Sequence, residues 1–238
     1  MASVIRLYVD HPLGVGQSVP LNREQSHYLF GVMRRGVGEV LELFNGRDGE
    51  WLARVVQAGK RNAILLCESN SKPMMLPPDL WMMFAPIKKA RTDFIVEKAT
   101  EMGAAQILPV QTDFTNSERI RQDRLQNHAL EAAEQCGGTY VPPVMELQKL
   151  SKLLDGWDDR HIMFCDENRV GEAVALSQQP GPWAILIGPE GGFSPAERER
   201  LEAMPQAQGV SLGPRILRAD TAAVAALALW QTSLGDWQ

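Results

Sequence analysis

The stretch AILIGPEGGFSPAE, residues 184–197, predicts a buried strand that runs through a glycine-rich loop directly into a helix. The unbroken apolar run 184–187 is typical of a strand that is covered on both faces. Ser194 is suited to the N-cap of the helix, Pro195 to its first position, and Glu197 completes a capping box. The stretch therefore indicates an α/β protein, in which such junctions bind ligands.

The loop between this strand and helix, residues 188–193, contains three glycines that let a ligand approach the backbone closely. A second loop, GPRILRADT at 213–221, joins a predicted strand at 210–212 to an apolar helix at 222–230. Two such loops can form one pocket, although a tight strand-to-helix turn is the simpler interpretation of each. Neither loop contains a P-loop or a G-x-G-x-x-G pattern, which disfavours kinases, GTPases and Rossmann dehydrogenases.

The composition is that of an ordinary globular chain, with 238 residues of which 45% are hydrophobic. The longest apolar stretch, 222–230, is far shorter than the roughly 20 residues of a membrane-spanning helix. Residues 1–20 lack the pattern of a signal peptide, so we expect a cytoplasmic protein. The three cysteines and four histidines are scattered without zinc-ligand spacing, which predicts reduced thiols and no metal site.

Charge is distributed unevenly along the chain. The net charge is −5, but residues 1–75 hold nine Lys and Arg against seven Asp and Glu. An acidic protein can still bind RNA through a local basic patch. The pair Arg34-Arg35 and the cluster Lys88-Lys89-Ala90-Arg91 are candidates for such patches, and a solvated charged surface is the alternative for each.

The pattern of elements predicts two domains. Residues 1–72 are predicted to form a small β-barrel-like domain, because they contain short strands separated by turn signals. The expected strands are at 6–9, 40–44, 51–56 and 63–67, and one helix is expected at 24–33. The polar and proline-rich segment 69–78 is interpreted as a linker. Over residues 73–238 strands alternate with helices, which predicts a mostly parallel sheet covered by helices. The expected strands are at 81–85, 107–110, 162–165, 184–187 and 210–212, and the expected helices are at 92–102 and 123–136.

Both glycine loops belong to longer motifs, Leu186–Ser194 and Leu212–Arg218, which resemble the paired motifs of the ribosomal RNA small subunit methyltransferase E family. That family is part of the SPOUT methyltransferases. The resemblance extends along the chain, in the family's order, through His27 with Val32-Met33-Arg34, Lys88 with Arg91, VEKATEMG at 96–103, and EQCG at 134–137. It implies a PUA-like N-terminal barrel, a C-terminal α/β domain with a trefoil knot, and a homodimer.

The resemblance also implies an activity, the transfer of a methyl group from S-adenosylmethionine to N3 of a uridine in the 16S rRNA of the small ribosomal subunit. The two loops would then form the cofactor pocket. The expected cofactor-binding residues are Leu186, Ile187, Gly188, Pro189, Glu190, Gly191, Gly192, Leu212, Gly213, Ile216, Leu217, Arg218 and Thr221.

Arg218 and Glu190 are the catalytic candidates. Neutral uracil carries a proton on N3, so the enzyme must favour the deprotonated base, and a guanidinium at Arg218 suits that anionic charge. The alternative for Arg218 is an ion pair with Asp220 or Glu190. Glu190 could orient the cofactor, act as a base, or only bind nearby backbone amides. For Asp220 and Thr221, N-capping of the last helix is the ordinary explanation.

The expected RNA-binding residues are His27, Arg34, Arg35, Lys88 and Arg91. The chain also departs from the family pattern at three places: Ala219-Asp220 stand where Thr-Glu is common, Gly138 follows EQCG in place of an arginine, and 112–115 lacks Glu-Arg-Ser. These departures put catalytic roles at 219 and 220 in doubt and suggest that RNA contacts are redistributed.

Two other functions fit the same sequence. One is a SPOUT methyltransferase that acts on another RNA such as transfer RNA, because fold alone does not set the substrate. The other is a ribosome-assembly or RNA-binding factor that has lost the chemistry, against which the intact glycine loop and Arg218 argue.

Overall fold

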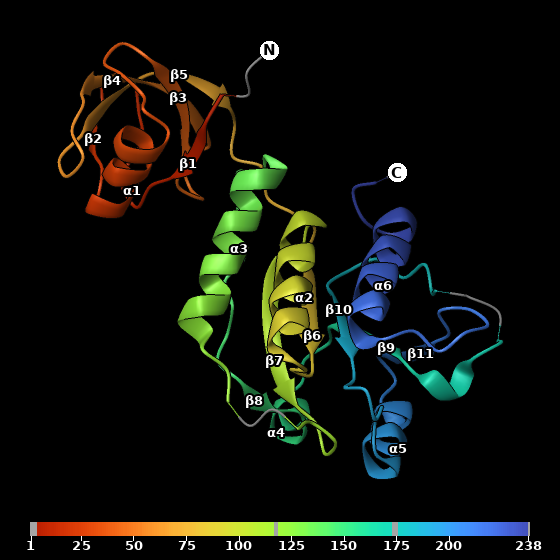
Figure 1. The fold of residues 1–238 in the computed structure, drawn as a ribbon. Helices are drawn as coiled ribbons and strands as arrows, with labels where there is room; N and C mark the ends of the chain where they lie inside the picture. Colours follow the sequence, from red (N-terminus) through yellow and green to blue (C-terminus); the bar gives the residue numbers. More distant parts are fainter. Residues whose placement is uncertain (1–3, 117–118, 173–175, 238) are drawn as a thin grey trace. The chain divides into compact units, whose positions relative to one another are not determined.

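The computed structural model describes residues 4–116, 119–172 and 176–237. Its contacts divide the chain into two compact units, shown in Figure 1. The first unit comprises Met1–Leu76 together with Ala133–Val141, and the second comprises Pro77–Ala132 and Pro142–Gln238. A mixed sheet in one unit and a parallel sheet in the other confirm the α/β class. The boundary between residues 72 and 73 stays a prediction.

The first unit is built on a five-stranded sheet in the order β1-β3-β4-β5-β2. β1 runs parallel to β3, and the other neighbours are antiparallel. Four of these strands are predicted by their apolar alternation, whereas β2 is too short to show a period. The bounds are β1 Arg6–Tyr8, β2 Ser18–Pro20, β3 Val40–Phe44, β4 Glu50–Gln57 and β5 Ile64–Lys72.

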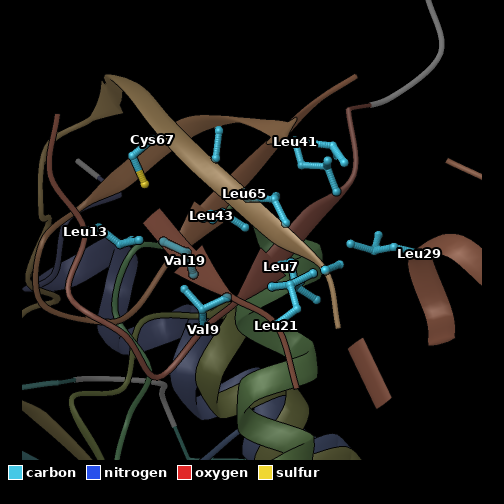
Figure 2. Packing of buried hydrophobic residues seen from close by; sticks show 13 residues of the cluster. Leu7, Val9, Leu13, Val19, Leu21, Leu29, Leu41, Leu43, Leu65 and Cys67 are labelled. Carbon is cyan, nitrogen blue, oxygen red and sulfur yellow. The ribbon is translucent and has the colours of Figure 1, made fainter. Parts of the chain in front are cut away.

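Alternate side chains of these strands form the core of the first unit (Figure 2). Leu41 and Leu43 of β3, Val55 of β4 and Leu65 of β5 are all fully buried. Each such side chain contributes about 1.5–3 kcal/mol when it is removed from water. The period of two therefore fixes which face of each strand meets the core.

The predicted helix at 24–33 is present, and its second half is a π-helix. It consists of a short α-helix, α1 (Arg23–His27), with a capping box at Asn22, followed by a π-helix, η1 (Tyr28–Val32). The backbone N–H of Met33 donates to the carbonyl of Tyr28, five residues earlier, at 2.9 Å. Gly31 permits the wider turn, since a Cβ atom there would lie 2.8 Å from Nδ1 of His27.

The predicted linker at 69–78 is wrong in its first part, because residues 69–72 belong to β5. Ser69 and Asn70 pair with Leu52 and Trp51 of β4. The amide of Asn70 donates to the carbonyl of Glu50 at 3.1 Å. Polar residues can form a strand when its ladder and side-chain hydrogen bonds are satisfied, and composition alone does not reveal such partners.

A buried ion pair joins β1 to β4 inside the first unit. The guanidinium of Arg6 donates to the carboxylate of Glu50, whose side chain has no exposed surface. Arg6 also donates to the carbonyls of Ala133, Glu134 and Gly138. These carbonyls close the end of a helix, where a cation is favourable. Residues 133–141 thus complete the first unit although they follow much later in the sequence.

The second unit contains a six-stranded parallel sheet in the order β11-β9-β10-β6-β7-β8. Strand β10 lies at its centre, and all five of its residues are buried, as the apolar run 184–187 predicts. The bounds are β6 Leu80–Phe84, β7 Gln106–Gln111, β8 Gln148–Lys149, β9 His161–Cys165, β10 Trp183–Ile187 and β11 Ala207–Val210.

Helices cover this sheet, as Figure 1 shows. The helices α2 and α6 pack against each other, and the amide of Gln231 on α6 donates to the carbonyl of Met102 at 2.6 Å. The other face carries the core in which Leu186 of β10 packs with Leu150, Leu154 and Leu201. The bounds are α2 Lys89–Glu101, α3 Gln122–Cys136, α4 Leu150–Asp155, the 3₁₀ turn η2 Glu167–Arg169, α5 Pro195–Ala203 and α6 Ala219–Ser233.

The last strand and the last helix differ from their predicted positions. Strand β11 ends at Val210, so the predicted strand 210–212 lies mostly in the following loop. Helix α6 begins at Ala219, three residues before the predicted start, because alanine is a strong helix former and an aspartate is favourable in the first turn. Within the part of the chain that the structure describes, no helix has the length and apolarity to cross a membrane.

Candidate functional site

The two glycine loops lie at the carboxyl ends of β10 and β11 and line one cavity of about 210 Å³. Ile187, Gly188 and Glu190 contribute from the first loop, and Leu212 and Leu217 from the second. Crevices outside the carboxyl ends of parallel strands are the usual ligand sites of such sheets. The geometry therefore brings the two loops together, as their sequences predict.

The first loop is held at its helical end by the predicted capping box. The backbone N–H of Glu197 donates to Oγ of Ser194 at 3.2 Å, and that of Ser194 donates to the carboxylate of Glu197 at 2.9 Å. Within the loop, the N–H of Gly192 donates to the carbonyl of Pro189 at 2.9 Å. Gly192 has a φ of +69°, a conformation that favours glycine. The loop is thus a fixed wall of the cavity.

The second loop is held by its own hydrogen bonds. The N–H of Gly213 donates to Oγ of Ser211 at 3.2 Å, and its carbonyl accepts from Gly171 at 3.3 Å. The N-cap of α6 is Arg218, not the predicted Asp220 or Thr221, which lie in the first turn of the helix. The carboxylate of Asp220 instead accepts from the N–H of Thr221 at 3.0 Å.

A third wall of the cavity comes from the segment after β9, which the sequence interpretation misses. Cys165, Asp166, Glu167 and Val170 all line the cavity. Their signal is present in the sequence, since β9 is itself a predicted strand and its carboxyl end lies at the same edge of the sheet. The residues after that strand are therefore expected to contribute to a site at this edge.

In this third wall, the thiol of Cys165 is protonated and the carboxylate of Asp166 is paired with an arginine. Burial raises the pKa of the Cys165 thiol to about 12, so that thiol is neutral at physiological pH. Asp166 is buried, and its carboxylate lies 3.1 Å from Nε of Arg198 on α5. Its other oxygen accepts from the N–H of Asn168 at 3.0 Å. This wall therefore presents a neutral thiol and a carboxylate that is already paired.

Most of the predicted cofactor residues line the cavity, and three do not. Leu186 points into the opposite core, as expected for a residue that alternates with Ile187 along β10. Gly191 is exposed at the outside of its loop, and Thr221 is exposed on α6. The residues that do line it are Ile187, Gly188, Pro189, Glu190, Gly192, Leu212, Gly213, Ile216, Leu217 and Arg218.

Near the cavity Arg91 is paired with carboxylates, whereas Arg215 and Arg218, which line the cavity, have no ion pair among the described residues. Arg91 of α2 lies 3.7 Å from the carboxylate of Glu190 and 3.6 Å from that of Asp220. These are the two carboxylates that the alternative interpretation gave to Arg218. Across the described ranges, Arg218 has no ion pair, and its side chain is exposed while it lines the cavity. Its guanidinium is therefore available to a ligand.

The predicted RNA-binding residues occupy different parts of the two units. Lys88 is exposed at the start of α2, whereas Arg91, on the same helix, is engaged by the two carboxylates. His27 and Arg34 are exposed on the first unit, and Arg35 pairs with Glu39 at 3.2 Å. Exposed cations suit phosphate contacts, so Arg91 is the least available of the set.

The three departures from the family pattern have defined places. Ala219 is buried and lines the cavity, which leaves no hydroxyl at that position. The carbonyl of Gly138 accepts a hydrogen bond from Arg6. The segment 112–115 forms a turn in which Thr115 donates its N–H to the carbonyl of Thr112 at 3.1 Å. Among the described residues, no cluster of His, Cys, Asp or Glu side chains has the make-up of a metal site.

Comparison with known proteins identifies both units. Residues 74–231 match the family model of an RNA methyltransferase domain, and residues 21–66 match that of an RNA methyltransferase PUA domain. Ribosomal RNA small subunit methyltransferase E of Bacillus subtilis is 30% identical, over 89% of either chain. The protein of the same name from Rickettsia conorii is 29% identical, over 94% of this chain and 93% of its own.

A solved structure agrees along the entire length. The crystal structure of ribosomal RNA small subunit methyltransferase E from Neisseria gonorrhoeae, bound to S-adenosyl methionine, superposes with a TM-score of 0.88. It is 29% identical and covers 99% of this chain and all of its own. The first unit is accordingly a PUA domain and the second an RNA methyltransferase domain. With both glycine loops at one cavity and relatives that match over nearly their full length, the chain belongs to the ribosomal RNA small subunit methyltransferase E family.

Proposed function

We propose that this chain methylates N3 of one uridine in the 16S rRNA of the small ribosomal subunit, with S-adenosylmethionine as the methyl donor. Membership of the family supports the reaction and the cofactor. The observation that carries the proposal is Arg218, which lines a cavity formed by two glycine loops and has no ion pair within the part of the chain that the structure describes. A cation in that place can act on a ligand because the neighbouring carboxylates are held by Arg91.

The cavity fits S-adenosylmethionine in its chemistry. An adenine ring needs apolar walls and a few polar contacts, which Ile187, Leu212 and Leu217 and the loop backbone can provide. Ile216 lines the cavity while 72% exposed, and Val170 does so while 40% exposed. Apolar side chains left open at a cavity gain stability when a ligand covers them. When bound there, S-adenosylmethionine supplies an electrophilic methyl group.

The residues at the cavity would then act on the uracil. Loss of the proton from N3 leaves negative charge that is shared with O2 and O4 of the base. The Arg218 guanidinium is suited to donate hydrogen bonds to that charge, and a fixed donor of this kind lowers the barrier. Glu190 lies 3.7 Å from Arg91, so we assign it to orienting the cofactor loop and not to accepting the proton.

The proposed RNA contacts, oligomeric state and location of the protein are those that the family resemblance implies. RNA phosphates would be held by His27, Arg34 and Arg35 on the first unit and by Lys88 on the second, with Arg91 contributing once it leaves its carboxylates. A homodimer, a trefoil knot in the C-terminal domain and a cytoplasmic location belong to the same proposal. Sedimentation of the purified protein tests the dimer, for which the expected mass is twice that of the chain.

The proposal is tested by transfer of labelled methyl from S-adenosylmethionine to small ribosomal subunits that lack the modification. Naked 16S rRNA and transfer RNA serve as parallel substrates, and the labelled nucleoside is then identified and mapped. Label in the subunits as 3-methyluridine is the expected result. Label in transfer RNA alone would replace the substrate, and cofactor binding without any transfer would leave a non-catalytic RNA-binding factor.

A further inference from the structure

Phe114 is a large aromatic side chain left open to solvent beside the candidate active site. It lies in the turn after β7 and is 45% exposed. A single exposed apolar side chain is common on protein surfaces, so the surroundings of Phe114 decide whether it marks a binding site. What this ring contacts within the protein indicates which partner it suits.

The turn that carries Phe114 is firmly held on α5. The hydroxyl of Ser194 donates to the carboxylate of Asp113 at 2.6 Å, and the N–H of Asp113 donates to Glu197 at 2.9 Å. Thr112 and Thr115 close the turn with hydrogen bonds of 2.8–3.1 Å. The same residues, Ser194 and Glu197, form the capping box that ends the first glycine loop. The turn and that loop therefore share one anchor.

The ring rests on the outside of the glycine loop. A Cβ atom on Gly191 would lie 3.4 Å from Cβ of Phe114 and 3.7 Å from its ring atoms Cγ and Cδ2. The residues on either side of Gly191, namely Glu190 and Gly192, both line the cavity. Consecutive Cα atoms are about 3.8 Å apart, so the ring lies one residue away from the cavity wall. Gly191 has no side chain that would separate the two.

We propose that Phe114 is the stacking platform that receives the uracil of the substrate at the mouth of the cavity, an assignment that rests on the proposed function. N3 lies on the base-pairing edge of uracil, so the base must leave any pair before it can react. A base taken out of its stack is stabilised by an aromatic ring, and an uncharged ring serves a neutral base without attracting phosphates. Phe114 is then a positioning residue for the base, and Arg218 acts on its charge.

The test compares Phe114→Ala, Phe114→Leu and Phe114→Tyr in methyl transfer to small subunits that lack the modification. Base stacking on an aromatic ring corresponds to a loss of about 5- to 150-fold on truncation. We expect that loss in kcat/KM for the Ala and Leu variants, while Tyr stays close to wild type. The Kd for S-adenosylmethionine is expected to stay within about twofold for all three. Trp237→Ala, an aromatic of similar exposure that follows α6 near the end of the chain, is the matched control.

Three results would overturn the assignment of Phe114, and a fourth would overturn the proposed function. Wild-type rates in the Ala and Leu variants would show that the ring is unused. Rescue by Leu, or a parallel weakening of cofactor binding, would show that Phe114 only packs against Gly191. Absence of methyl transfer by the wild-type protein would overturn the proposed function itself. The wild-type reaction alone reveals this failure, whereas failure of the Phe114 assignment is seen only in the variants.

Discussion

At the scale of single residues, Arg218 differs from Arg91 because its guanidinium has no carboxylate partner among the described residues. We expect Arg218→Ala to lower kcat about 10²- to 10³-fold, since a fixed donor to developing negative charge is lost. The Kd for S-adenosylmethionine, measured by calorimetry, should change little. Arg218→Lys keeps the charge but not the forked donors and should recover only part of the rate.

An equal loss of turnover and cofactor affinity in Arg218→Ala would make Arg218 a cofactor ligand or a structural residue. Arg91→Ala serves as a second variant for comparison with Arg218→Ala, because it removes the partner of Glu190 and Asp220 and leaves Arg218 in place. If Arg91 only holds these carboxylates, its loss should affect cofactor binding more than the chemical step. Single-turnover measurements separate the two.

The residues of the two glycine loops that line the cavity are largely predictable from the sequence, whereas residues from other segments are not. The glycine positions 188 and 192 follow from the loop sequence, whereas Leu186 is excluded by strand alternation that the loop pattern does not report. Asp166 is missed because a lone acid after a strand has no motif. Which carboxylate pairs with which arginine depends on how helices are placed in space, so the Arg91 pairs could not be predicted from spacing.

At the scale of elements, the start of α5 depends on one hydroxyl. Ser194 accepts from the N–H of Glu197 and donates to Asp113, so it caps the helix and holds the 112–115 turn together. We expect Ser194→Ala to lower the free energy of unfolding by about 0.5–2 kcal/mol, the range for a lost N-cap. Urea denaturation followed by circular dichroism measures this change.

A double-mutant cycle with Asp113→Ala separates the two roles of Ser194. If the hydroxyl couples the turn to the helix, the double variant should lose less stability than the sum of the single variants. Strict additivity would mean that the Asp113 contact contributes nothing and that capping accounts for the entire effect.

Elements with a repeating pattern or a strong cap are the ones that the sequence predicts well. The predicted strand 184–187 differs from β10 by one residue at its start, and the predicted start of α5 at Pro195 is confirmed. The π-helix after His27 is not predictable from its apolar residues, because it differs from an α-helix in one hydrogen-bond step that the apolar pattern does not report. The polar end of β5 depends on the carbonyl of Glu50, a partner more than a dozen residues away.

At the scale of the molecule, the first unit is expected to lose stability in acid. Burial alone would raise the pKa of Glu50, but hydrogen bonds from Arg6, Ser71 and Lys72 outweigh it and lower that pKa. A carboxylate with a lowered pKa stabilises the folded state fully above its ordinary value of about 4.3. That stabilisation is lost as the pH falls through the lower pKa of the folded state.

Glu50→Gln tests this dependence. At pH 7 the variant should be less stable by about 3–5 kcal/mol, since it leaves Arg6 buried without its partner charge. Urea titrations at pH 7, 5 and 3 should show the gap between wild type and variant close only below about pH 4. A gap that is constant across this range would contradict the role of the Glu50 charge.

Binding of RNA by both units should depend on salt through their exposed cations. Each phosphate contact that is removed lowers the slope of log K against log salt by about 0.7–0.9. Arg34→Gln and Lys88→Gln should each show this decrease, measured with 16S rRNA by filter binding. Arg47→Gln is a matched control because its guanidinium is paired with Asp10. Unchanged slopes in the first two variants would remove them from the interface.

The hydrogen bonds of Arg6 to carbonyls at 133, 134 and 138 have a consequence for synthesis of the chain. Translation adds about 5–20 residues per second, so segment 133–141 leaves the ribosome several seconds after residue 76. During that interval Arg6 lacks the carbonyl partners that it has in the complete chain. The PUA domain starts first on the ribosome and is completed only when the helix of a later domain has been made.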